Sequence, residues 1–258
     1  MTPPLSIHLL PNTVDPDRLG GSVAVMIDVL RASTTLTHAL AAGCHSIRPC
    51  RDVDTARQLA SQLAPDDSPT RQAPLLAGER GGIRIDGFDL DNSPAGFTSQ
   101  TVAGRTIVFT TTNGTAALEA CRHAQLVLVA AFSNMNAVIQ TLLQRGQEVH
   151  LVCAGTDGQV TAEDCLCAGA IGLALRQHTG FDTHACDATR IAIGLYQHLD
   201  EHLDQEPDLL LEAIRDSHGG RNLRELGFDE DIALAARRDT LDLVPCFNSH
   251  DNTISVLA

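Results

Sequence analysis

Residues 23–35, VAVMIDVLRASTT, decide the fold of this chain. Five consecutive apolar residues, 23–27, are typical of a strand buried on both faces of a parallel sheet. Asp28 ends the strand, and the following stretch, 33–42, predicts a helix that begins with Ser33 and Thr34, residue types common at helix starts. A strand, a short connection and a helix in this order predict a βα unit of an α/β fold.

Further apolar runs alternate with helix-length stretches along the chain. The predicted strands lie at residues 46–48, 75–77, 107–110, 126–129 and 149–153. The predicted helices lie at residues 53–63, 115–122, 134–144 and 162–177. Residues 65–74 are typical of a polar loop, residues 188–240 are mostly helical, and residues 241–245 are a candidate closing strand. We therefore expect one α/β domain over residues 1–258, with a largely parallel sheet and a mostly helical C-terminal third.

The charge balance narrows the possible partners. The chain has 18 basic and 32 acidic residues, a formal net charge of −14. It lacks the basic surface typical of nucleic-acid binders and of proteins held on anionic membranes, so we expect neither partner. All the basic residues are Arg, which excludes a lysine-containing P-loop and a Schiff-base lysine. Arg side chains and backbone amides are left to bind anions.

The cysteines and the apolar runs indicate a cellular location. Eight cysteines are scattered without a CxxC pair, which is typical of buried, reduced thiols. No run approaches the roughly 20 apolar residues of a membrane span, and residues 1–18 lack the basic start of a signal peptide. We expect a cytoplasmic protein, with a homodimer as the default assembly.

Ligands of open parallel sheets bind beyond the carboxyl ends of the strands, so the residues there are the candidates for chemistry. Asp28 ends the first strand, and Arg31, Ser33 and Thr34 follow it. Free amides, hydroxyls and the positive end of a helix dipole suit a phosphate or a sulfonate. The alternative is an ordinary helix cap with Arg31 on the surface.

Two further strand ends carry polar groups. Glu79 and Arg80 lie in a glycine-rich segment, where Arg80 could make a bidentate contact to an oxyanion. A plain turn with a surface ion pair explains the same residues. Thr111, Thr112 and Asn113 follow another strand and offer neutral donors, although these residue types also favour helix caps for purely local reasons.

A fourth strand end leads to Glu163 and Asp164 at a predicted helix start. Acidic residues in a first helical turn are favoured by the helix dipole alone. The alternative is that one of them meets Asp28 and holds a magnesium ion, which needs only one or two carboxylates besides water and substrate oxygens.

Five blocks of this chain resemble the signature blocks of the 2-phosphosulfolactate phosphatase (ComB) family, in the same order and with similar spacing. The blocks are DVLRASTT (28–35), LLAGERGG (75–82), FDLDNSP (88–94), TTTNGT (110–115), and CAG (153–155) with AEDCLCAG (162–169). Residues 217–223, SHGGRNL, and the later Asp231 and Val244-Pro245 are also similar to the family. Asp91 departs from the family pattern, in which Gly more often precedes Asn-Ser-Pro.

The resemblance implies a three-layer α/β/α fold and the Mg²⁺-dependent hydrolysis of 2-phospho-3-sulfolactate to 3-sulfolactate and phosphate, a step toward coenzyme M. Such a substrate is a small anion that carries a phosphate, a sulfonate and a carboxylate. The alternatives are a phosphatase for a related phosphorylated hydroxy acid and a non-catalytic binder of an anionic metabolite.

The strand ends and the matched blocks together suggest a role for each candidate residue. Asp28 is the nucleophile or a metal ligand, and Glu79 is the general acid or base. Asp28, Glu163 and Asp164 are the candidate ligands of Mg²⁺. The candidate substrate-binding residues are Arg31, Ser33, Thr34, Arg80, Thr111, Thr112 and Asn113.

Three other motifs have simpler explanations. His198 and His202 match the HxxEH pattern of zinc peptidases, but a solvated helix face explains them better. Asp89-Leu90-Asp91 is similar to the DxD of another phosphatase class, yet lacks a preceding hydrophobic strand, so we expect a loop. Cys165 and Cys167 point in different directions on a helix and are expected in the core.

Overall fold

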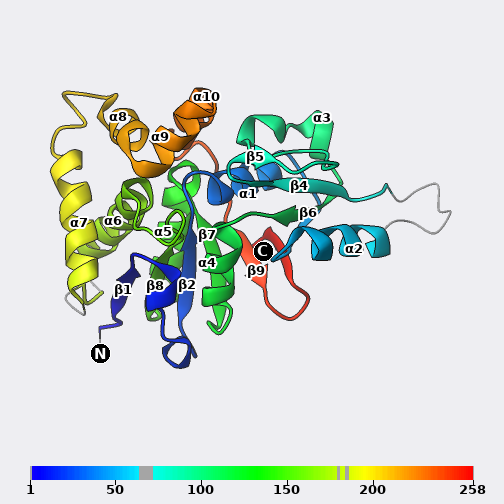
Figure 1. Ribbon diagram of the computed structural model, residues 1–258. Helices are drawn as coiled ribbons and strands as arrows, with labels where there is room; N and C mark the ends of the chain where they lie inside the picture. The colour runs from blue at the N-terminus through cyan, green and yellow to red at the C-terminus, as the bar shows by residue number, and fades with distance from the viewer. Residues whose placement is uncertain (1, 64–71, 179–180, 184–185, 258) are drawn as a thin grey trace.

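A mixed sheet of ten strands forms the centre of the protein (Figure 1). The computed structural model describes residues 2–63, 72–178, 181–183 and 186–257. The strand order is β1-β8-β2-β7-β9-β10-β3-β6-β4-β5. Most of the predicted polar loop at residues 65–74 lies outside the described residues.

One half of the sheet is built around β2 (Val23–Ile27), whose five residues are all buried. It runs parallel to β7 (Leu126–Ala130) on one side and to β8 (Val149–Cys153) on the other. β1 (Leu5–His8), which the sequence patterns did not predict, runs parallel to β8 at the edge. The continuous apolar run at the start of the fold is therefore a central strand, as predicted.

The other half contains β3 (Ser46–Pro49), β6 (Thr106–Thr110) and β4 (Leu75–Arg80), which are parallel to one another. β5 (Ile83–Arg84) adds a short antiparallel hairpin. β4 continues to Arg80 instead of turning at Gly78 as predicted. A side chain at Gly78 would overlap the Thr110 carbonyl of β6. The glycine therefore allows β4 and β6 to lie close together and does not form a turn.

The C-terminal hairpin joins the two halves. β9 (Pro245–Asn248) runs antiparallel to β7, and β10 (Thr253–Val256) runs antiparallel to β3. The prediction of a closing strand over residues 241–245 was wrong in position, because the strand begins at its last residue, Pro245. A proline has no amide hydrogen to donate to a ladder and is tolerated at a strand's first position.

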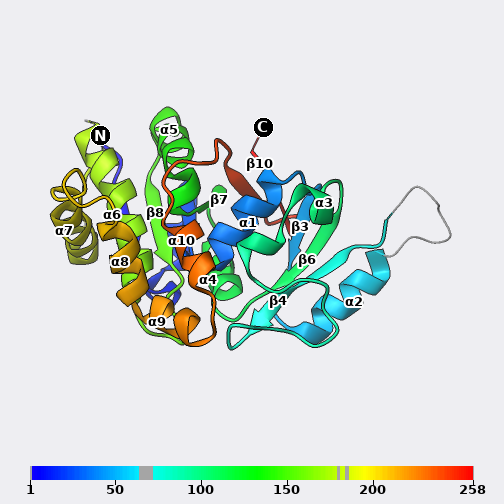
Figure 2. The ribbon, with the colours of Figure 1, turned by 90° about the horizontal axis from the view of Figure 1, so that it is seen from above.

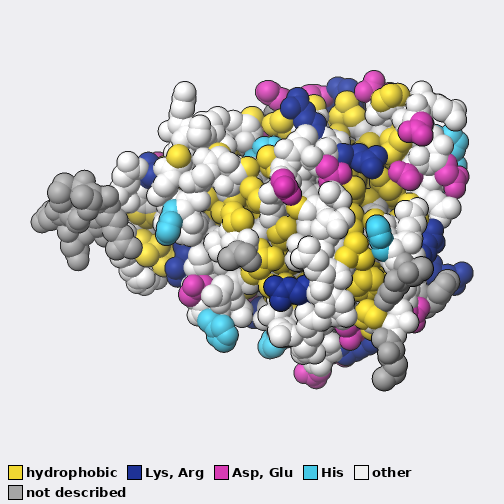
Figure 3. All heavy atoms as spheres, turned by 180° about the vertical axis from the view of Figure 1, so that it is seen from behind, with side chains coloured by type: hydrophobic (Ala, Val, Ile, Leu, Met, Phe, Trp, Pro, Cys, Tyr) yellow, Lys and Arg dark blue, Asp and Glu magenta, His cyan; other side chains and the backbone are white. Residues whose placement is uncertain are grey.

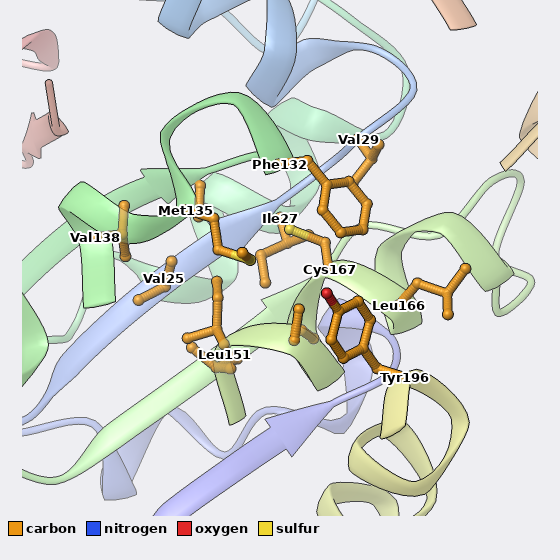
Figure 4. Packing of buried hydrophobic residues seen from close by; sticks show 14 of the residues in the cluster. Val25, Ile27, Val29, Phe132, Met135, Val138, Leu151, Leu166, Cys167 and Tyr196 are labelled. Carbon is orange, nitrogen blue, oxygen red and sulfur yellow. The ribbon is translucent and has the colours of Figure 1, made fainter. Parts of the chain in front are cut away.

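Helices cover both faces of the sheet, which confirms the three-layer architecture. The alternating side chains Val25 and Ile27 of β2 pack with α5 (Met135–Arg145) and α6 (Ala162–Gln177). Figure 4 shows Val25 and Ile27 beside Met135 and Phe132 in this core. Ala24 and Met26 face the opposite layer, where α1 (Ala32–Ala41) and α4 (Gly114–Cys121) pack.

The remaining helices lie around this core. They are α2 (Val53–Leu63), α3 (Ser99–Val102), α7 (Asp187–Asp200), α8 (Leu209–Asp216), α9 (His218–Glu225) and α10 (Asp229–Ala235). Short 3-10 turns lie at Pro11–Thr13, Pro16–Arg18, Pro94–Gly96 and Phe132–Asn134. Figures 1 and 2 show α8, α9 and α10 together at the end of the sheet where β2 leads into α1. The predicted helical C-terminal third is confirmed, and it reaches the carboxyl ends of the parallel strands.

The structure also gives the state of the cysteines, the character of the helices and the distribution of charge on one face. All eight cysteines are free thiols and six of them are buried, as predicted. Within the described ranges, no helix has the length and apolar character that a bilayer crossing requires. On the face drawn in Figure 3, Arg and acidic side chains are interspersed around a partly apolar middle.

Candidate functional site

A polar cavity of about 320 Å³ lies beyond the carboxyl ends of the parallel strands. The ends of β2, β4, β6 and β8 contribute to its wall, and α9 contributes from the C-terminal third. Six of the predicted site residues line it, namely Asp28, Arg31, Glu79, Thr111, Thr112 and Asn113. The fold therefore brings together three of the strand ends that the sequence singles out.

Asp28 lies at the base of this cavity and is 6% exposed. Its Oδ1 accepts a hydrogen bond from the Ala32 amide at 3.1 Å, at the start of α1. Burial is the main cause that raises the pKa of Asp28 to about 7, and the negative charges of Glu79 and Glu163 raise it further. The negatively charged form of a carboxyl group is energetically unfavourable at this buried position unless a cation lies beside it.

Glu79 uses both carboxylate oxygens to hold the walls of the cavity together. Its Oε2 accepts from the Gly82 amide and its Oε1 from the Thr112 amide, each at 2.8 Å. Gly82 belongs to the β4–β5 turn and Thr112 to the loop after β6. Glu79 therefore fixes the position of one predicted substrate-binding segment.

Arg31 is buried at 3% exposure, so its placement on the surface is excluded. Its Nη1 donates to Asp231 Oδ2 at 2.7 Å, and its Nη2 donates to the Gly82 carbonyl at 2.7 Å. The Phe228 ring lies 4.3 Å from the guanidinium carbon, a cation–π distance. The guanidinium group is thus held on three sides where it reaches the cavity.

Three predicted substrate-binding side chains do not line the cavity and bond to other groups of the protein. The Asp28 amide donates to Ser33 Oγ at 2.9 Å, and Thr34 Oγ1 donates to the Val29 carbonyl at 2.8 Å. Arg80 donates to the Glu79 carbonyl at 2.6 Å and to the Thr110 hydroxyl at 2.9 Å. In this structure the three side chains stabilise the segments that carry the cavity residues.

Asp164 connects two strand ends. Its Oδ1 accepts from the Val29 amide at 2.8 Å and its Oδ2 from the Gly155 amide at 2.9 Å. Burial, followed by the charges of Glu163 and Asp28, raises the pKa of Asp164 well above its ordinary value. Because of the two hydrogen bonds, each oxygen of Asp164 already has a backbone amide as its donor.

Glu163 is buried behind Gly219, a residue of the cavity wall. Its Oε2 has no hydrogen-bond partner, and burial raises the pKa of its carboxyl group. A side chain at position 219 would overlap Glu163 Oε1 and displace that carboxylate. An unpartnered buried carboxylate oxygen is uncommon and calls for a donor or a cation.

The residues fit a magnesium ion in part. Asp28 and Glu163 supply hard oxygen donors, and their mutual repulsion and the unpartnered Glu163 oxygen favour a cation between them. Asp164 fits less well, because both of its oxygens accept from backbone amides. The described residues contain no group of three or more His, Cys, Asp or Glu side chains that could hold a metal by themselves. Water or substrate oxygens would have to complete the coordination.

Several site residues were missed by the sequence analysis. Asn92 lines the cavity and its Oδ1 is buried without a partner, as is the Oγ1 of the predicted residue Thr111. Asn222 of α9 lines the cavity, and Asp231 of α10 pairs with Arg31. Asn92 lies in a matched block, which was a usable signal. Asp231 also matches the family pattern, but its pairing with Arg31 had no local signal, because the two residues lie 200 positions apart.

The competing motifs have structural explanations. His202 lies beyond the end of α7, and both His198 and His202 are exposed. The Asp89 and Asp91 stretch forms a loop, as predicted, and Asp91 Oδ1 accepts from the Ser93 amide at 2.7 Å. That bond stabilises the local turn without glycine. Cys165 and Cys167 are both buried, which agrees with core packing.

The fold and the cavity define an α/β protein with a polar site for a small ligand at the carboxyl ends of its strands. The chain belongs to the 2-phosphosulpholactate phosphatase family, whose model matches residues 8–250. A protein of Symbiobacterium thermophilum described as a probable 2-phosphosulfolactate phosphatase is 40% identical over 233 residues, which is 90% of this chain and 93% of that protein. A protein of Synechococcus sp. with the same description is 40% identical, over 89% of this chain and 92% of its own length. One of Caldanaerobacter subterraneus is 34% identical, over 91% of both chains. The predicted family is confirmed.

Proposed function

We propose that the protein is a Mg²⁺-dependent phosphatase that hydrolyses 2-phospho-3-sulfolactate to 3-sulfolactate and phosphate. The observation that carries the proposal is the cavity itself, in which Asp28, Arg31 and the Thr111–Asn113 loop meet. The descriptions of the relatives supply the substrate. The cavity volume of about 320 Å³ suits a molecule of this size.

The charges around the cavity support a cation in the reaction. Asp28 and Glu79 both line the wall, and their negative charges repel an anionic substrate unless a cation neutralises them. We propose Asp28 and Glu163 as direct ligands and Asp164 as a residue that holds the ligands in place. A bound Mg²⁺ would neutralise charge on the transferring phosphoryl group.

The protein's own groups have distinct proposed roles. The reaction breaks the bond between phosphorus and the C2 oxygen of the substrate and transfers the phosphoryl group to water, directly or through the Asp28 carboxylate. Arg31 faces an anionic group of the substrate, and the Thr111 hydroxyl and neighbouring groups of its loop donate to phosphoryl oxygens. Glu79 remains the proposed general acid or base, and its two amide contacts support an additional role in shaping the cavity.

Phosphate release from the purified protein tests the proposal. The substrates are racemic phosphosulfolactate and phospholactate, each with Mg²⁺ and with EDTA. We expect Mg²⁺-dependent release that prefers the sulfonate, and we expect Asp28→Asn to abolish it. Asp17→Asn is the matched control, because Asp17 is exposed, lies outside the matched blocks and does not line the cavity.

Each outcome distinguishes among the candidate functions. Preference for phospholactate would point to a related phosphorylated hydroxy acid as the substrate. If folded protein released phosphate from neither compound but bound the phosphoester tightly, the proposed enzymatic activity would be wrong. The result would favour a non-catalytic binder of an anionic metabolite. The step toward coenzyme M, the cytoplasmic location and the homodimer remain proposals, and the free, mostly buried thiols support the location.

A further inference from the structure

The Arg31 side chain is held by two segments that are far apart in the sequence, and a third segment holds its partner Asp231. Asp231 of α10 accepts from Nη1, and Gly82 of the β4–β5 turn accepts from Nη2. Ser93 Oγ in turn donates to the second oxygen of Asp231 at 2.6 Å. Both Arg31 and Asp231 are at least nine-tenths buried, so water does not compete for these bonds.

We infer that Asp231 is a positioning residue, which holds the Arg31 guanidinium in the orientation that binds an anionic group of the substrate. This inference rests on the proposed function for the identity of the substrate. Asp231 itself does not line the cavity, whereas Arg31 does. Its effect on the substrate must therefore pass through Arg31.

The donor count of the guanidinium group supports this division of roles. Arginine has five N–H donors in a planar fork, and two are committed to Asp231 and Gly82. The remaining donors are available to an anion in the cavity. The Phe228 ring packs against one face of the planar guanidinium group and so restricts its rotation. A side chain held in this way does not lose further rotamer freedom when a ligand binds, which favours affinity.

The same contacts join the C-terminal third to the site. Asp231 lies on α10, whereas Arg31 lies at the start of α1 and Ser93 precedes a 3-10 turn. The orientation of Arg31 therefore depends on the docking of α10. Without the Asp231 carboxylate the guanidinium keeps only the Gly82 hydrogen bond and the Phe228 ring contact, so its orientation is less restricted.

Asp231→Asn is the principal test, because it preserves size and removes the charge. We expect KM for phosphosulfolactate to rise about 10- to 100-fold while kcat changes less than about fivefold. Ser93→Ala should give a smaller change in the same direction. Asp229→Asn is the matched control, since Asp229 lies on the same helix and pairs with Arg215 at the surface, and we expect its kinetic constants to be unchanged.

A double-mutant cycle separates positioning from a purely structural effect. In an Arg31→Met background, Asp231→Asn should change kcat/KM by less than about twofold, because the residue through which it acts is absent. An equal loss in both backgrounds would overturn the inference. Circular dichroism of each variant identifies those that do not fold, and Arg31→Met with Asp231→Asn removes both charges together, which favours folding.

A binding measurement keeps this inference separate from the proposed function. Calorimetric titration with inorganic phosphate in the presence of Mg²⁺ does not require turnover. If the wild-type protein binds phosphate but hydrolyses neither phosphoester, the proposed function fails while the Asp231 comparison can still be made. Equal phosphate dissociation constants for the wild-type protein and the Asp231→Asn variant would overturn the inference.

Discussion

The Asp164 carboxylate accepts a hydrogen bond from the Val29 amide at 2.8 Å, which ties the first turn of α6 to the end of β2. Its second oxygen accepts from Gly155, at the end of β8. One buried side chain therefore sets the spacing of two strand ends that border the cavity. Its position in the fold is explained by these two bonds, without any ligand.

Asp164→Ala should lower the free energy of unfolding by roughly 2 to 4 kcal/mol, because two buried amides lose their acceptor. Asp164→Asn should lower the free energy of unfolding by less, since the amide carbonyl oxygen of Asn can still accept a hydrogen bond from one backbone amide. Urea denaturation measures both values. Glu119→Ala, which removes an exposed ion pair with Arg122, should stay within about 0.5 kcal/mol. Equal effects of the two alanine substitutions would contradict the account.

Asp28 should make the metal-free protein less stable as the pH rises from about 4 to 7. Burial raises the pKa of Asp28 from 3.8 to about 7 in the folded protein. The folded state therefore binds more protons than the unfolded state in this window, and the free energy of unfolding falls with increasing pH. Asp28→Asn should remove that contribution and stabilise the protein at pH 8 by on the order of 1 to 3 kcal/mol.

The difference between the wild-type protein and the Asp28→Asn variant removes the contribution of distant titrating groups and leaves that of Asp28 with its effect on the neighbouring Asp164. His8, whose pKa burial lowers to about 4, contributes the opposite slope in both proteins and cancels. Urea unfolding in EDTA at several pH values gives the comparison. Parallel stability curves for the two proteins would show that Asp28 does not titrate in this range.

Magnesium should raise the melting temperature through Asp28 and Glu163. In thermal unfolding with increasing Mg²⁺, we expect the wild-type protein to be stabilised and the Asp28→Asn and Glu163→Gln variants to lose the effect. Asp164→Asn should retain part of it, because its oxygens accept from amides in the structure. If Asp164→Asn abolished the Mg²⁺-dependent stabilisation and Glu163→Gln kept it, Asp164 would be the metal ligand and Glu163 would not.

Gly219→Ala should lower kcat/KM at least about tenfold, because the added methyl group overlaps Glu163 Oε1 and displaces that carboxylate. Gly194→Ala is the control, since nothing lies within 4 Å of a side chain there and the position is in α7. The control should keep its activity and gain up to about 1 kcal/mol of stability, as expected for alanine in a helix. Steady-state kinetics and urea denaturation measure the pair.

Local patterns predicted the parts of the site that lie close to their own strand. The apolar run that ends at Asp28 identified β2, and polar residues at the end of β4 and after β6 identified Glu79 and the Thr111–Asn113 loop. Periodicity and strand ends are local properties of the chain. They indicate which residues reach the edge of the sheet but not which of their atoms face a ligand.

The orientation of the side chains depends on long-range contacts that no local pattern contains. Ser33 and Thr34 lie at the predicted strand end, yet their hydroxyls bond to the backbone. Arg31 is buried because its Nη1 donates a hydrogen bond to Asp231, which lies on α10. β1 was missed although its four residues, Leu5–His8, alternate between apolar and polar side chains as in an edge strand.

The position of the β9–β10 hairpin has a consequence for synthesis of the protein. The four strands β1, β8, β2 and β7 and the four strands β3, β6, β4 and β5 form two groups that meet only through this hairpin. While the ribosome is still translating the segment before Pro245, β7 and β3 are unprotected edges in the nascent chain. The two groups of strands are therefore joined into one sheet only when β9 and β10 have been made and have paired with these edges.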